Sequence, residues 1–223
     1  MEFGLSTHLF VNERLSSHIL DLIVGAGIRK MEIFAARQHL DYYDKNHVRD
    51  VGQWFRDHEV ALHSLHAPMF TDFDWGRSDG VAVSVAHLER RLRIDSMDEI
   101  KRAIEVAEIL PFRFLVLHLG VEREEYDLRK FDAAFTSIEH LKIFAKERGA
   151  QVLLENTPNE LSTPERLDKM RALRTQHMGD MQAAMAKRDD ATKALYAALS
   201  PEQKKLFDAE HSRKGSQHGS KHH

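Results

Sequence analysis

Residues 112–118 read Phe-Arg-Phe-Leu-Val-Leu-His, and this almost wholly apolar run decides the fold class. A helical pattern precedes it and another follows it, each with an apolar residue every three or four positions. The first pattern consists of Ile100, Ala103, Ile104, Ala107 and Leu110, and the second of Leu128, Phe131, Phe135, Ile138, Leu141 and Phe144. A short apolar strand between two amphipathic helices is typical of a parallel sheet that is covered by helices.

The alternation of strand and helix extends outward from this run in both directions. The pattern predicts further strands at residues 3–10, 30–35, 60–66 and 152–155, and helices at 14–24, 46–58 and 127–148. The helix before the central run is expected to begin near Ser96, because Ser96 and Glu99 have the spacing of a capping box, and to end at Pro111. An irregular insert is expected over residues 69–92.

Five strands that alternate with helices form either an open doubly wound sheet or a (β/α)8 barrel. No glycine-rich phosphate loop follows the first strand, so the dinucleotide-binding fingerprint is missing. Polar residues instead gather where the third, fourth and fifth strands end, which is where a barrel keeps its active site. We therefore predict an α/β protein with a partial TIM-type barrel of about five parallel strands over residues 1–163.

The amino-acid composition changes after the fifth strand. Val152 is the last valine and Ile143 the last isoleucine of the chain. A hydroxyl cap followed by Pro164 predicts a helix start, and the apolar residues beyond it are almost all Ala, Leu and Met. We predict a helical segment over 164–211, with a second helix from Ser200, and a disordered tail over 212–223, where Gly, Ser, Lys and His have nothing to bury.

Composition restricts the possible functions. The chain has no cysteine, so any metal must be bound by His, Asp or Glu. Residues 164–223 carry twelve Lys and Arg against eight Asp and Glu, a charge of +4, and the rest carries 20 against 27, or −7. An acidic body argues against nucleic acid as the main ligand. Without a signal-like or membrane-spanning run, a cytoplasmic location away from membranes is expected.

Three residues at strand ends form a candidate metal site. His66, His118 and Glu155 end the third, fourth and fifth strands, so their side chains should converge at one mouth of the barrel. Two imidazoles and a carboxylate are normal ligands for zinc, manganese or a similar ion. His8 after the first strand and Glu32 on the second are candidates for substrate contact at the same mouth.

The three strand ends also carry a resemblance. Residues 64–68 (Ser-Leu-His-Ala-Pro), 115–120 (Leu-Val-Leu-His-Leu-Gly) and 153–158 (Leu-Leu-Glu-Asn-Thr-Pro) resemble, in that order, the xylose isomerase-like barrel superfamily. That group includes sugar phosphate isomerases and epimerases and zinc-dependent apurinic endonucleases. The resemblance covers about residues 1–165, although Leu119 stands where a proline is frequent. It implies that His66 and His118 are ligands or substrate contacts, and that Glu155 is a ligand that also moves a proton.

The resemblance implies a metal-dependent sugar or sugar-phosphate isomerase or epimerase with a small-molecule sugar substrate. The family's other ligands come from strands 6 to 8, which the sequence does not supply. We therefore expect a truncated barrel that binds zinc, manganese or magnesium weakly, and its activity is in doubt. The alternatives are an apurinic endonuclease-like phosphodiesterase and a non-catalytic fusion with a helical partner-binding module.

The tail has a resemblance of its own. Residues 198–203 (Ala-Leu-Ser-Pro-Glu-Gln) are similar to the LTxxQ-motif helical proteins of the bacterial periplasm, which act in envelope stress and as chaperones. The likeness covers about residues 165–211. Because barrel and tail then belong to different compartments, we expect a natural fusion or a frame-shifted join near Thr163. Self-association is expected through the open sheet edge or the Met-rich helix.

Overall fold

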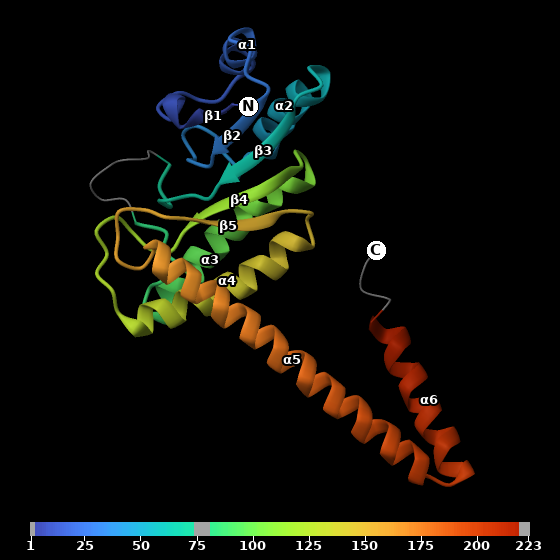
Figure 1. The fold of residues 1–223 in the computed structure, drawn as a ribbon. Coiled ribbons are helices and arrows are strands. Elements are labelled where there is room, and N and C mark those ends of the chain that lie inside the picture. Colours follow the sequence, from blue (N-terminus) through green and yellow to red (C-terminus); the bar gives the residue numbers. More distant parts are fainter. Residues whose placement is uncertain (1–2, 74–80, 219–223) are drawn as a thin grey trace. The chain divides into compact units, whose positions relative to one another are not determined.

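The computed structural model describes residues 3–73 and 81–218, and the chain divides into two compact units, Met1–Lys169 and Met170–His223 (Figure 1). The first unit contains one sheet whose strands are all parallel and follow one another in chain order. They are β1 (Gly4–Ser6), β2 (Lys30–Phe34), β3 (Ala61–His66), β4 (Phe112–His118) and β5 (Gln151–Glu155). Parallel strands in chain order, alternating with helices, confirm the predicted partial TIM-barrel fold.

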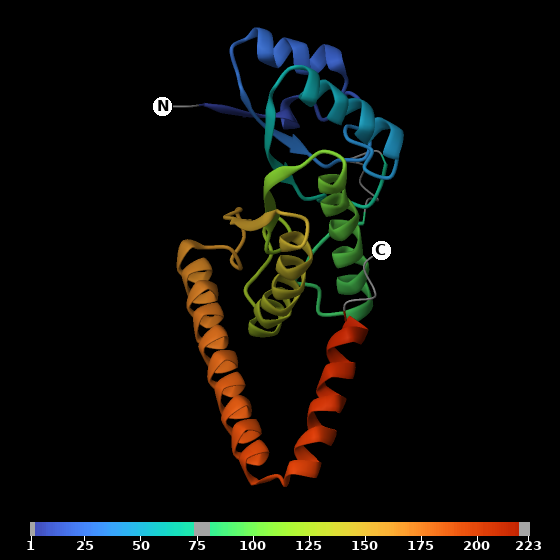
Figure 2. The same cartoon turned by 90° about the vertical axis from the view of Figure 1, so that its right-hand side faces the viewer.

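Helices connect successive strands of the first unit, and Figure 2 shows them beside the sheet. They are η1 (Thr7–Phe10), α1 (Ser17–Gly25), α2 (Lys45–Asp57), α3 (Arg90–Ile104), η2 (Glu105–Glu108) and α4 (Leu128–Lys146). Side-chain caps begin two of them: Asp44 accepts hydrogen bonds from the first turn of α2, and Asp127 accepts one from that of α4.

The two faces of the sheet differ in burial. Leu115 and Leu117 of β4 point to one face and are almost completely buried. Alternate residues point to the other face, where Val116 is half-buried and Leu153 of β5 is 38% exposed. The hydrophobic core therefore lies between the sheet and its helices, and the opposite face, the inner face of a barrel, is accessible in the described unit.

Two local expectations are wrong. The first strand ends at Ser6, because the Ser6 hydroxyl caps η1 by accepting the His8 N–H. Ser96 lies inside α3 and caps nothing: its hydroxyl accepts the Ser84 N–H, while Glu99 binds two tyrosines from the β2–α2 loop. The side chains of Ser96 and Glu99 bind residues that are distant in the sequence, and these contacts outweigh the local capping pattern.

The second unit continues the helix α5 (Pro164–Ala198) and adds α6 (Pro201–His218). Ser200 and Gln203 form a reciprocal cap, in which each side chain accepts the other residue's backbone N–H, and Tyr196 donates a hydrogen bond to Asp208 across the turn. The helix α6 extends to His218 and so includes Ser212, from which the sequence pattern predicts a disordered tail. Residues 219–223 lie outside the described residues.

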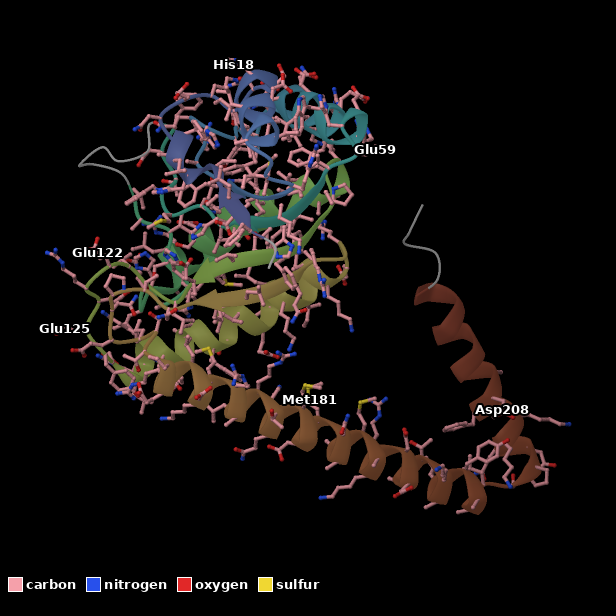
Figure 3. All side chains as sticks on the ribbon, turned by 45° about the horizontal axis from the view of Figure 1, so that its top comes forward. His18, Glu59, Glu122, Glu125, Met181 and Asp208 are labelled. Carbon is pink, nitrogen blue, oxygen red and sulfur yellow. The ribbon has the colours of Figure 1, made fainter. Side chains whose placement is uncertain are left out.

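Three of the four methionines of α5 are surface residues, and the fourth, Met170, is buried. Met178, Met181 and Met185 are between 47% and 58% exposed, and Figure 3 shows the side chain of Met181 standing out from the helix. No helix in the described part of the chain is both long and apolar enough to span a membrane.

Candidate metal centre

Three neighbouring strands place the candidate ligands. His66, His118 and Glu155 are the last residues of β3, β4 and β5, and His118 pairs directly with Glu155 in the sheet register. The register pairs His66 with Val116, which shares a face with His118. All three side chains therefore leave the sheet at its carboxyl edge, on the inner face.

The ligand atoms form a nearly equilateral triangle. His66 Nε2 lies 3.2 Å from His118 Nε2 and 3.3 Å from Glu155 Oε2, and the third side, from His118 Nε2 to Glu155 Oε2, is 3.2 Å. The structure thus brings together all three ligands predicted from the strand ends. Among the side chains that the structure describes, in residues 3–73 and 81–209, they form the one group of three or more His, Asp or Glu with this geometry.

The orientation of His66 is fixed from two sides. Its Nδ1–H donates to the Ala67 carbonyl oxygen at 2.8 Å, and its ring stacks on Phe34 with centroids 4.5 Å apart. A carbonyl oxygen only accepts, so the neutral ring carries its proton on Nδ1 and presents the Nε2 lone pair to the triangle. Backbone support of this kind is the usual outer shell of a metal-binding histidine.

The triangle contains more lone pairs than protons. Burial, followed by the neighbouring His66, lowers the pKa of His118, while Glu155 opposes the shift. If His66 presents an Nε2 lone pair and His118 is neutral, the triangle holds at most one proton, on Nε2 of His118. The three acceptor atoms are therefore short of donors, and a cation bound between them would satisfy all three.

The spacing fits a metal ion. In a tetrahedral zinc site with bonds of about 2.0–2.1 Å, neighbouring ligand atoms lie about 3.3–3.4 Å apart. The measured sides of 3.2–3.3 Å match one face of such a tetrahedron. The donor set, two imidazole nitrogens and one carboxylate oxygen, also suits manganese. The residues present therefore fit a divalent ion.

The two predicted substrate contacts lie beside the triangle but are not members of it. Glu32 shares a face with His66, because β2 and β3 pair Glu32 with Ser64 and Phe34 with His66. Its Oε2 accepts a hydrogen bond from the Ser64 hydroxyl at 3.1 Å. His8 is exposed on η1, and its ring packs against Phe34 at 4.7 Å.

Phe34 is a site residue that the sequence reading missed. It lies between His8 and His66 and contacts both rings. Phe34 is an apolar residue at the end of an apolar strand, so nothing in the sequence pattern distinguishes it from a core residue. Only the pairing of β2 with β3 reveals its position.

A clamp between two loops holds the edge that carries His118 and Glu155. The Asn159 side chain, after β5, donates to the Val121 carbonyl after β4 at 3.0 Å, and Arg123 N–H donates to the Pro158 carbonyl at 2.9 Å. Gly120, at the start of the first loop, lets the Glu124 carboxylate approach the backbone closely, because a Cβ at this position would overlap that carboxylate. The clamp fixes both strand ends relative to each other.

The comparisons with known proteins agree with this architecture. The family model described as xylose isomerase-like TIM barrel matches residues 20–179. No curated protein matches the chain. Among solved structures, a D-tagatose 3-epimerase-like protein shares 24% identity with a TM-score of 0.59, and the match covers 76% of this chain and 60% of that one.

Two further solved structures share the fold. A D-psicose 3-epimerase, crystallised in the presence of D-fructose, is 12% identical with a TM-score of 0.54, and the match covers 73% of this chain and 54% of that one. The IolI protein with a bound zinc atom is 15% identical with a TM-score of 0.53, with 69% and 51% covered. At these identities the likeness is one of fold. The chain spans 51% to 60% of the length of these three structures.

Proposed function

The chain belongs to the xylose isomerase-like TIM barrel family, and we propose that it is a metal-dependent isomerase or epimerase of a sugar or sugar phosphate. The triangle of His66, His118 and Glu155 carries the proposal. Among the solved structures of similar fold, one is a D-tagatose 3-epimerase-like protein, one is a D-psicose 3-epimerase, and a third has a bound zinc atom. These likenesses support a sugar substrate and a divalent ion, zinc, manganese or magnesium.

His66, His118 and Glu155 would hold the ion. When bound, it would supply positive charge that polarises a carbonyl or hydroxyl of the substrate. His66 is pre-oriented by Phe34 and Ala67, so it needs no rearrangement to present Nε2. The Glu155 side chain is 46% exposed, so the site is open to water and to a small molecule.

Glu155 would also move the proton. A carboxylate oxygen next to the substrate can remove the proton from the carbon beside the carbonyl. Return of that proton to the neighbouring carbon, while the hydroxyl proton moves to the former carbonyl oxygen, is isomerisation. Delivery of a proton to the opposite face of the same carbon is epimerisation, and it needs a donor on that face, such as a water molecule. Oε2 of Glu155 faces the histidines, which leaves Oε1 for this transfer.

Glu32 and His8 would contact the substrate. Both lie on strands or turns that end beside the triangle, and His8 is exposed. Glu32 is held by Ser64 and would accept a hydrogen bond from a sugar hydroxyl.

The described site does not favour the apurinic phosphodiesterase. Such an enzyme needs several metal ions and a cationic rim, whereas one ligand group is found among the described residues, and the barrel part of the chain is acidic. Five strands leave one wall of a barrel open, so we expect weaker metal binding than in a closed eight-stranded barrel.

Solvent exchange tests the proposed chemistry. The full chain, loaded with Zn²⁺ or Mn²⁺, is incubated in D₂O with ketohexoses and their phosphates, and NMR follows deuterium at the carbon beside the carbonyl. We expect metal-dependent exchange that Glu155→Gln abolishes. Exchange that is equal in Glu155→Gln and wild type, or absent with every sugar at full metal loading, would refute the function.

We also propose that the chain associates with itself. Among the described strands β5 lies at an edge of the sheet, and α5 presents half-exposed methionines. Light scattering after size-exclusion chromatography tests this. A dimer that Leu153→Lys or Met181→Glu dissociates supports it, and a monomer at all concentrations rejects it.

A further inference from the structure

His39 is a completely buried histidine that is not one of the three triangle residues. It lies in the β2–α2 loop and joins two other segments of the chain. Its Nδ1 is 2.6 Å from the Glu13 carbonyl oxygen, and its Nε2 is 2.9 Å from the Thr7 hydroxyl. A buried side chain with two long-range bonds orders the loops that it connects.

The bonds of His39 fix its proton. The Glu13 carbonyl only accepts, so Nδ1–H donates to it and Nε2 accepts the Thr7 hydroxyl proton. The Thr7 oxygen then accepts the backbone N–H of Phe34 at 3.1 Å. Every polar atom of this chain of bonds is satisfied when His39 is neutral.

The chain of bonds leads to the candidate metal centre. Thr7 begins η1, which carries His8, and Phe34 ends β2. Phe34 lies between the rings of His8 and His66. His39 is thus linked to a ligand through Thr7 and Phe34 without contacting that ligand.

We propose that His39 is a positioning residue of this centre: through the Thr7 hydroxyl it fixes Phe34 and η1, and thereby sets the orientation of His66 and the place of His8. Only the effect of His39 on catalysis rests on the proposed function. The positional effect on His66 is a property of the chain with or without metal.

Thr7 offers a matched pair of variants. Thr7→Val keeps the shape but removes the hydroxyl, and Thr7→Ser keeps the hydroxyl. His39→Gln removes the ring itself. The control is Ser137→Ala, because Ser137 is also buried and its hydroxyl bonds the carbonyl oxygens of Val85 and Ala133, far along the chain from Thr7 and His39.

Two readouts separate positioning from general stability. In the metal-free protein, long-range ¹H–¹⁵N NMR of the imidazoles should show shifts of His66 and His8 in Thr7→Val and His39→Gln, and none in Thr7→Ser or Ser137→Ala. With Co²⁺ as probe, the first two variants should change the visible spectrum and bind about tenfold more weakly, the lower end of the range for groups that orient ligands.

Unchanged His66 and His8 resonances in folded Thr7→Val and His39→Gln would overturn the proposal, as would equal shifts in Ser137→Ala. Failure of the proposed function looks different. Co²⁺ binding that Glu155→Ala does not weaken would reject the metal centre, while the NMR comparison in metal-free protein would still decide the role of His39.

Discussion

The rings of Phe34 and His66 lie 4.5 Å apart with only 25° between their planes. Phe34 is almost fully buried, so this stack holds the proposed metal ligand His66 against the core of the protein. The relationship connects the packing of β2 to the chemistry proposed for β3.

Replacement of Phe34 by leucine should loosen His66 more than it weakens the fold. The smaller aliphatic side chain keeps most of the buried volume, so we expect a loss of about 1–2 kcal/mol in the free energy of unfolding. Urea unfolding measures this loss, and Zn²⁺ titration should show weaker binding. Unaltered Zn²⁺ affinity in Phe34→Leu would show that the stack does not orient His66.

The loop after His118 should not tolerate a side chain at Gly120. A Cβ there would overlap the Glu124 carboxylate, whose Oε2 accepts the Val121 N–H at 2.9 Å, and would press on Leu161. We expect Gly120→Ala to cost about 1–3 kcal/mol by overpacking and to lower the melting temperature. Gly179→Ala is the control, since nothing lies within 4 Å of that position in α5, and it should be neutral or stabilising. Equal melting temperatures for the two variants would contradict the tight packing of Gly120 against Glu124 and Leu161.

A buried network joins the β2–α2 loop to α3. Tyr42 and Tyr43 donate hydrogen bonds to the two carboxylate oxygens of Glu99, at 2.5 and 2.6 Å, and Arg102 pairs with the same carboxylate. Burial, reinforced by Glu99, raises the pKa of the Tyr42 hydroxyl, which therefore stays a donor. Tyr42→Phe should cost about 1.5–3 kcal/mol, the range for a hydrogen bond to a charged group. Tyr43→Phe should cost less, because Tyr43 is 43% exposed. Chemical unfolding of both variants checks the order, and a reversed order would contradict it.

Acid should destabilise the protein through His39. Burial lowers the pKa of His39 below its ordinary value of 6.5, and His47 contributes in the same direction against the opposing effect of Glu13. The unfolded chain therefore binds a proton at a higher pH than the folded one, so the free energy of unfolding falls as pH drops below 6.5 and levels off below the folded pKa. The loss between pH 7 and 5 should be smaller in His39→Gln than in wild type. An identical pH dependence in both proteins would show that His39 does not titrate in this range.

The sequence predicts the regular part of the fold and the ligands, because both follow from local pattern. Apolar strands between amphipathic helices indicate a parallel sheet, and the last residue of each strand then lies at one edge, so His66, His118 and Glu155 are found without coordinates. Metal binding, the truncation and the LTxxQ likeness of the tail remain predictions.

The supporting contacts could not be predicted in the same way. His39 and Thr7 are 32 residues apart, and Tyr42 and Glu99 are 57 apart, so no local pattern pairs them. Ser96 and Glu99 are an example: they have the spacing of a capping box, but both lie inside α3 and their side chains make tertiary hydrogen bonds instead. Long-range partners are set by strand register and loop packing, which the sequence reading did not resolve.

The central claim is that His66, His118 and Glu155 bind a divalent cation, and metal content after equilibrium dialysis against Zn²⁺ or Mn²⁺ tests it directly. Three histidines near the end of the chain, His218, His222 and His223, are replaced by alanine in every sample to remove adventitious ligands. We predict about one ion per chain in the parent and a loss of at least about tenfold in affinity in the His66→Ala, Glu155→Ala double variant. The same sub-stoichiometric metal in both proteins would contradict the claim.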